Sequence, residues 1–164
     1  MNPIIGDAVI AFADQFQLPE RVVNIDELPW VAFDDGTCHF KPLRFDLNTG
    51  GWIYLFKIKS NQTLSRHRHT GGTVIGYNIQ GTWRYQEQSW VARPGTFIYE
   101  PAGDIHTLIT EDEEVITLFI LSGALQYFDE NNQLVGQDDV YTVLKKYRDH
   151  CTAHNIAFKE ELIY

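Results

Sequence analysis

Cysteine is nearly absent from this sequence, which contains only Cys38 and Cys151. The two residues are far apart and neither belongs to a CxxC pair, so the pattern favours neither a disulfide framework nor a thiolate zinc site. Free thiols are typical of proteins in a reducing compartment. We therefore expect a cytoplasmic protein that folds without disulfide bonds.

Long hydrophobic runs and positive charge are also scarce. No apolar run approaches the roughly 20 residues that a membrane helix needs, and the N-terminal stretch carries Asp7 and Asp14 in place of a basic leader. The chain has 13 basic and 22 acidic residues, a formal net charge of -9, so its field repels nucleic acid and anionic lipid. These features predict neither a nucleic-acid partner nor a membrane partner.

Aromatic residues, in contrast, make up 13% of the chain, which suits a β-rich core around an aromatic-lined pocket. Short β-rich runs separated by turn signals extend from Val22 to Phe128, and residues 115–121 are apolar on both faces, as in a central strand. No repeat or linker divides the sequence. We expect one domain over residues 1–164, with an all-β barrel over about residues 22–128.

Helical patterns flank this β-rich region. Residues 7–16 place Val9, Phe12 and Phe16 on one helical face. After Asp138 the apolar period lengthens and predicts an amphipathic helix over about residues 139–154. Its apolar stripe contains Val140, Val143, Leu144, Tyr147 and Cys151.

Three histidines carry the chemical signal of the sequence. Side chains at i and i+2 of a strand point to the same face, so His67 and His69 direct two imidazoles at one point. A distant strand of a barrel can supply His106 as a third ligand. Imidazole ligands suit Fe, Zn, Ni and Cu alike, so the ligand set predicts one divalent ion without choosing it.

Two spaced patterns surround these histidines. The first contains His67, His69 and a strand that ends at Gly81, and the second runs from Gly95 through the sequence PAGDIH to His106. Together they resemble the double motif of the cupins. The usual glutamate of the first motif is missing, and Thr110 stands where the second motif ends in asparagine. The resemblance implies a cupin-type double-stranded β-helix, or jelly-roll, barrel with short helical extensions at both ends.

The runs HRHTGG and GTWRYQEQSWVARPGTFIYEPAGDIHT narrow the resemblance. They are similar to the 2,4'-dihydroxyacetophenone dioxygenase and acetylacetone dioxygenase group, and more loosely to the cupin domain of zinc-binding anti-sigma factors. In the dioxygenase group three histidines hold a non-haem Fe(II), which assigns His67, His69 and His106 as metal ligands and favours Fe(II), with Zn or Ni as alternatives. The resemblance also suggests Glu87 as a carboxylate near the metal.

The position of Glu87 has two interpretations. It shares strand parity with Trp83 and Tyr85, so it is a buried metal ligand or catalytic carboxylate if that face is interior. Otherwise it lies at the wet end of the strand beside a loop. Glu100 is expected at the surface. The candidate walls of a substrate pocket are Tyr54, Phe56, Tyr77 and Tyr85.

Other chemistry has little support. His150 and His154 stand four residues apart on the predicted C-terminal helix, but no third ligand accompanies them, so we interpret them as a solvated helix flank. The sequence has no P-loop, no GxGxxG fingerprint and no GxSxG elbow. Of the kinds of chemistry considered, the sequence patterns support only that of a bound metal ion.

The resemblance therefore predicts a dioxygenase that takes a small-molecule substrate and O2. The expected reaction is cleavage of a carbon–carbon bond in a β-diketone or an α-hydroxyketone, with the dicarbonyl or hydroxyketone chelating the metal as an enolate. Alternatives are a metal-binding module without catalytic activity and another cupin enzyme such as an isomerase. The resemblance and the exposed sheet edges of a jelly roll also predict a homodimer or homotetramer.

Overall fold

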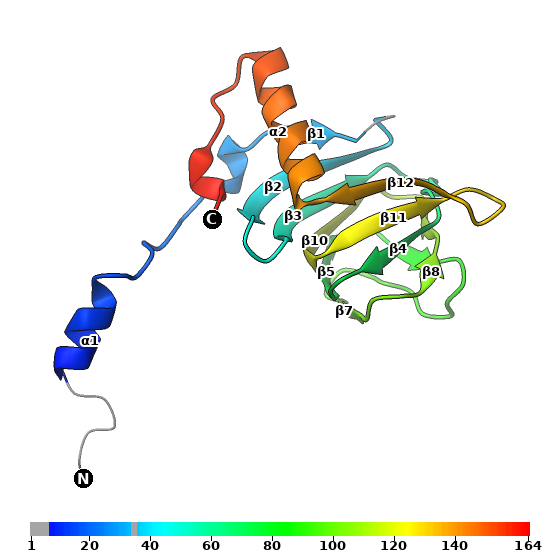
Figure 1. The fold of residues 1–164 in the computed structure, drawn as a ribbon. Helices are drawn as coiled ribbons and strands as arrows, with labels where there is room; N and C mark the ends of the chain where they lie inside the picture. The colour runs from blue at the N-terminus through cyan, green and yellow to red at the C-terminus, as the bar shows by residue number, and fades with distance from the viewer. Residues whose placement is uncertain (1–6, 34–35) are drawn as a thin grey trace, which may run out of the picture.

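The computed structural model describes residues 7–33 and 36–164, and its described part is built mainly from antiparallel strands (Figure 1). The larger sheet has six strands in the order β1-β2-β3-β10-β5-β7. Their bounds are Val31–Ala32 (β1), Cys38–Asp46 (β2), Gly51–Ile58 (β3), Val115–Ser122 (β10), Val74–Gln80 (β5) and Phe97–Glu100 (β7).

Two smaller sheets complete the β-structure. One has the order β12-β11-β4-β8, and the other pairs β6 with β9. Their bounds are Leu134–Asp139 (β12), Ala124–Phe128 (β11), His67–Thr70 (β4), Ile105–His106 (β8), Trp83–Tyr85 (β6) and Leu108–Thr110 (β9). Because β12 pairs with β11, the sheet continues beyond the predicted limit of the barrel at Phe128.

The strand β10 is the central strand that its apolar sequence predicts. It pairs with β3 on one side and with β5 on the other. The alternation in β3 places Trp52, Tyr54 and Ile58 in the core. Inward side chains from the sheets thus form one apolar interior, and the His-bearing strand β4 lies in the opposite sheet, paired with β11 and β8.

The helices lie outside the barrel. α1 covers Asp7–Asp14 and ends two residues before the predicted limit, while α2 covers Val140–His154 as expected. Asp139 caps α2 through a capping box with Thr142. Short 3-10 helices occur at Ile25–Glu27 (η1) and Glu160–Leu162 (η2). No helix within the described ranges is long and apolar enough to cross a membrane.

Candidate metal centre

The backbone register brings the three histidines together. His67 and His69 project from the same face of β4, and β4 pairs with β8 so that His67 lies directly opposite His106. All three side chains are buried, and one ring nitrogen from each lies within 4.8 Å of the others. The predicted cluster is therefore present, and its residues could bind a metal ion.

The protonation pattern of the cluster fits a cation. The backbone oxygen of Ser65 lies 2.9 Å from Nδ1 of His67 and can only accept, so Nδ1 carries the proton and Nε2 keeps its lone pair. Nε2 of His106 is buried and has no hydrogen-bond partner. A buried polar atom without a partner is costly, and a bound cation would satisfy it. The donor set of three imidazoles thus fits a divalent transition metal.

Burial also keeps the rings in the form that binds metal. It lowers the pKa of His67, and burial together with the neighbouring histidines lowers the pKa of His69 and His106 to about 3. The Tyr85 ring stacks on His106 with ring centroids 3.7 Å apart. The imidazoles are therefore neutral at physiological pH, as metal ligation requires.

Glu100 is a carboxylate of this site that the sequence interpretation placed at the surface. It is 6% exposed, and its Oε2 lies 3.6 Å from Nε2 of His106 and 3.8 Å from Nε2 of His69. Oε2 has no hydrogen-bond partner, whereas Oε1 accepts a 2.8 Å bond from the Tyr85 hydroxyl. Burial raises the pKa of Glu100 to about 7. The expectation of exposure was wrong because Glu100 shares the inward parity of Ile98 in β7.

Glu87, in contrast to Glu100, is exposed to solvent. β6 ends at Tyr85, so strand parity does not extend to Glu87, which lies exposed in the following turn. Its Oε2 accepts a 2.8 Å bond from the backbone N–H of Thr107. Partial burial would raise the pKa of Glu87, but its hydrogen bonds to Thr107 outweigh this and lower it. The structure therefore places Glu87 beside the strand of His106 and outside the histidine cluster.

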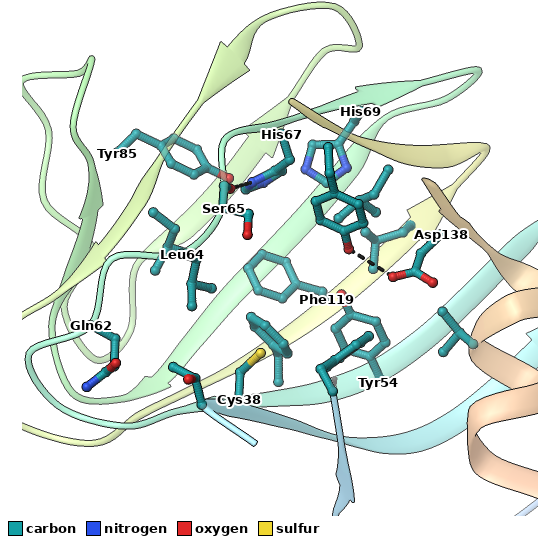
Figure 2. Close-up of a pocket in the computed structure, with 18 of the residues that line it drawn as sticks. Cys38, Tyr54, Gln62, Leu64, Ser65, His67, His69, Tyr85, Phe119 and Asp138 are labelled. Atoms are coloured by element: carbon teal, nitrogen blue, oxygen red, sulfur yellow. Dashed lines mark hydrogen bonds between the residues drawn. The ribbon is translucent and has the colours of Figure 1, made fainter. Parts of the chain in front are cut away.

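A cavity of about 400 Å³ adjoins the cluster, with His67 and His69 in its wall. Figure 2 shows these histidines on one side, Cys38 and Tyr54 on the opposite side, and Phe119 between them. Of the predicted walls, Tyr54, Phe56 and Tyr85 line this cavity. Tyr77 does not, because the inward positions of β5 belong to Val74, Gly76 and Asn78, and Tyr77 faces outward.

Polar groups in the cavity wall include two residues that the sequence did not suggest. The Tyr127 hydroxyl donates a 3.0 Å bond to Oδ2 of the buried Asp138, which Figure 2 labels in the cavity wall. Nζ of Lys146 on α2 lies 3.9 Å from Oδ1 of Asp138. Tyr127 and Asp138 arise from β11 and β12, beyond the region that the two motifs cover. Only the alternation of these strands could have indicated them.

A second cavity of about 360 Å³ lies against the other members of the site. His106 and Glu100 contribute to its wall, together with Trp90 and Asp104. Tyr85 lines both cavities. The three histidines are therefore divided between the walls of two cavities.

His150 and His154 lie away from this site on α2. Their rings stack with centroids 4.1 Å apart, and Nδ1 of His154 lies 2.9 Å from the backbone oxygen of His150. Among the His, Cys, Asp and Glu side chains of residues 7–33 and 36–164, one group of three has ligand atoms close enough to share a metal ion, and it consists of His67, His69 and His106.

Comparisons with known proteins agree with this geometry. Residues 19–126 match the family model of the ChrR cupin-like domain. An RmlC-like cupin protein from Ralstonia eutropha JMP134 is 32% identical, with a TM-score of 0.84 over 88% of this chain and 94% of that one. The acetylacetone dioxygenase from Acinetobacter johnsonii is 15% identical, with a TM-score of 0.73 over 81% of this chain and 94% of that one. No curated protein matches the chain.

Proposed function

Because this chain belongs to the ChrR cupin-like domain family, we propose that it is a metal-dependent dioxygenase that cleaves a carbon–carbon bond of a β-diketone or an α-hydroxyketone with O2. The observation that carries the proposal is a buried three-histidine cluster, two members of which, His67 and His69, line an aromatic cavity. The fold shared with an acetylacetone dioxygenase supports this choice of reaction.

The metal ligands in this proposal are His67, His69 and His106. Three neutral imidazoles leave the full 2+ charge of the ion, so the site favours an anionic, chelating substrate. Fe(II) is the proposed ion, with Zn or Ni as alternatives. When bound, the ion would supply Lewis-acid stabilisation of the enolate and a place for O2 to react.

Glu100 acts as the proton acceptor. Its Oε2 has no protein partner and lies beside the ring nitrogens of two histidines, so it can take the proton that the substrate loses on forming the enolate. The Tyr85 hydroxyl fixes the other carboxylate oxygen.

The cavity wall positions the substrate and excludes water. Phe56, Phe119 and Tyr54 contribute aromatic surface to the wall of the cavity. Both atoms of O2 enter the products: the scissile bond breaks to give a carboxylic acid and a second carbonyl fragment, so substrate plus O2 equals the sum of the two products. Excess water would compete for the site and is displaced by the apolar wall.

Oxygen uptake tests the reaction directly. Protein reconstituted anaerobically with Fe(II) should consume O2 when a panel of β-diketones and α-hydroxyketones is added, one O2 for each substrate cleaved. The variant His69→Ala should lose both bound metal and uptake, while His150→Ala should keep both, because His150 lies outside the cluster. Bound iron without substrate-dependent uptake across the panel would contradict the proposal.

A second candidate is a metal-binding module without catalytic activity, which the match to a ChrR cupin-like domain favours. This candidate predicts metal bound by the same histidines and no turnover. An isomerase would convert substrate without consuming O2, so product analysis under anaerobic conditions separates it from the dioxygenase.

A further inference from the structure

The N-terminal arm, residues 9–22, presents apolar side chains to solvent. Every side chain from Val9 to Val22 is exposed, and Figure 1 shows the segment running away from the barrel. Phe12 and Phe16 contact each other, with ring centroids 5.2 Å apart, yet remain 62% and 70% exposed. A helix as short as α1 is marginal in water unless its apolar face is packed.

A second exposed apolar surface lies on the six-stranded sheet. This sheet patch consists of Tyr77, Ile79, Phe97, Tyr99 and Ile120. The register makes it continuous: Tyr77 is opposite Phe97, and Ile75 connects Ile120 on β10 with Tyr99 on β7. The patch reaches the free edge of the sheet, because β7 is the last strand.

Among the described residues, the segment that follows the arm covers another part of the same sheet face. Lys41 on β2 donates a 2.7 Å bond from Nζ to the backbone oxygen of Ile25, and Nζ of Lys57 on β3 lies 4.5 Å from the Trp30 ring centroid. The segment that follows the arm thus lies over β2 and β3. Leu55 on β3 is buried, while Tyr99 on β7 is 60% exposed.

We propose that two copies of this chain associate by exchanging their N-terminal arms, so that each arm packs on the sheet patch of the other copy. One arm and one patch would together bury roughly 1,000 Å², and two reciprocal contacts roughly 2,000 Å², which is the size of a stable protein interface. Residues 17–23, when extended, span about 24 Å and can bridge two barrels. The exchange is closed and symmetric, since each copy gives an arm and receives one.

The mass in solution tests the association. Sedimentation of the wild-type chain should give twice the chain mass of 18.9 kDa. The arm variant Phe12→Asp/Phe16→Asp and the patch variant Phe97→Asp/Tyr99→Asp should each raise the dissociation constant at least about 100-fold. The controls are Gln17→Asp, which changes a polar residue of the arm and leaves its apolar side chains intact, and Val135→Asp, which changes an exposed residue of β12 outside the arm and the patch; both should remain dimeric.

Mixing the two variants identifies the occupant of the patch. Each variant alone has no intact contact, but a mixed pair has one, between the patch-variant arm and the arm-variant patch. The mixture should therefore form heterodimers of intermediate affinity. A dimer of patch against patch would not be restored in this way.

Three results would overturn the proposal. One is a monomeric wild-type chain, which would mean that each arm folds onto its own barrel or stays in solvent. The second is an arm variant as dimeric as wild type, and the third is a mixture that stays monomeric. The arm variant alters only exposed side chains outside the barrel, so it keeps the test valid even if the patch variant unfolds.

Discussion

Each histidine of the cluster is held neutral by burial, which makes the stability of the metal-free protein depend on pH. In the unfolded chain the histidines take up protons below about pH 6.5, whereas folding lowers the pKa of His69 and His106 to about 3. Their contribution is complete above pH 6.5 and is lost as pH falls from there toward 3. Glu100, whose pKa folding raises to about 7, has the opposite dependence: its contribution is present below about pH 4.5 and is lost as pH rises to 7.

Folding lowers the pKa of three histidines and raises that of one carboxyl group, Glu100. The histidines therefore determine how the stability of the metal-free protein changes with pH. The free energy of unfolding of the metal-free protein should rise between about pH 5 and pH 6.5. His69→Ala should reduce the slope of this rise by about 1 kcal/mol per pH unit, close to the limit of 1.4 for one proton at pH 5 and about half of it at pH 6.5. Urea unfolding in the presence of a chelator measures it, with His150→Ala as the control. An unchanged slope in His69→Ala would mean that burial does not hold this ring neutral.

Glu100 and Glu87 offer a matched pair for the proton acceptor. With the proposed reaction, Glu100→Gln should lower kcat by about 100-fold or more and remove the acidic limb of the pH profile, because the amide cannot take the proton. Glu87→Gln should change kcat only a few-fold, since Glu87 contacts the backbone of Thr107 outside the cluster. Initial rates of oxygen uptake across pH measure both, and equal losses would assign no special role to Glu100.

The contrast between these glutamates shows what local sequence can and cannot supply. The histidine cluster was predictable because the i and i+2 spacing of His67 and His69 and the PAGDIH run are local patterns. The burial of Glu100 depends on which face of β7 meets the core, and the exposure of Glu87 depends on where β6 ends. Both are set by tertiary pairing, which strand parity alone does not fix.

At the level of elements, the connection from β10 to β11 carries the chain from the large sheet into the sheet that holds the histidines. Gly123 makes this turn with a φ of +82°, and its Cβ, if present, would lie 1.9 Å from the backbone oxygen of Thr70. Thr70 ends the strand that bears His67 and His69. The turn and the metal site therefore share a backbone contact.

Gly123→Ala should destabilise the protein by more than about 2 kcal/mol, because a side chain there has both an unfavourable φ and a backbone clash. Gly95→Ala is the matched control: its φ is +90°, but its Cβ meets open space, so it should cost only about 1 kcal/mol. Thermal unfolding compares the two. Equal costs would mean that the Thr70 contact relaxes freely.

The main elements were predictable because their periods are strong: the apolar strand at β10 and the helix α2 appear where the sequence places them. Tyr77 was misassigned because alternation gives two faces without saying which one meets the core. The additional strand β12 has a mixed sequence, LVGQDD, with little hydrophobic alternation, and is held by its pairing with β11.

For the whole molecule, the cluster joins strands that are distant in sequence, β4 and β8, so metal binding should stabilise the native state as a unit. At about 100 times its dissociation constant, a divalent ion should add about 2.7 kcal/mol and raise the Tm of the metal-free protein by roughly 5–10 °C. Scanning calorimetry with Fe(II), Zn or Ni measures the shift. His150→Ala should retain it, and an undiminished shift in His69→Ala would place the ion elsewhere.

The histidines line two cavities, and this arrangement affects the order in which two reactants can bind. If a site can be reached by one route only, its two reactants must bind in a fixed order, because the wrong reactant bound first would block the other. With the proposed reaction, a ketone that fills the cavity lined by His67 and His69 would leave the cavity lined by His106 and Glu100 unfilled. If O2 reaches the cluster from that second cavity, we expect the two reactants to bind in random order, and an inhibitor that competes with the ketone for the larger cavity should leave the binding of O2 unchanged.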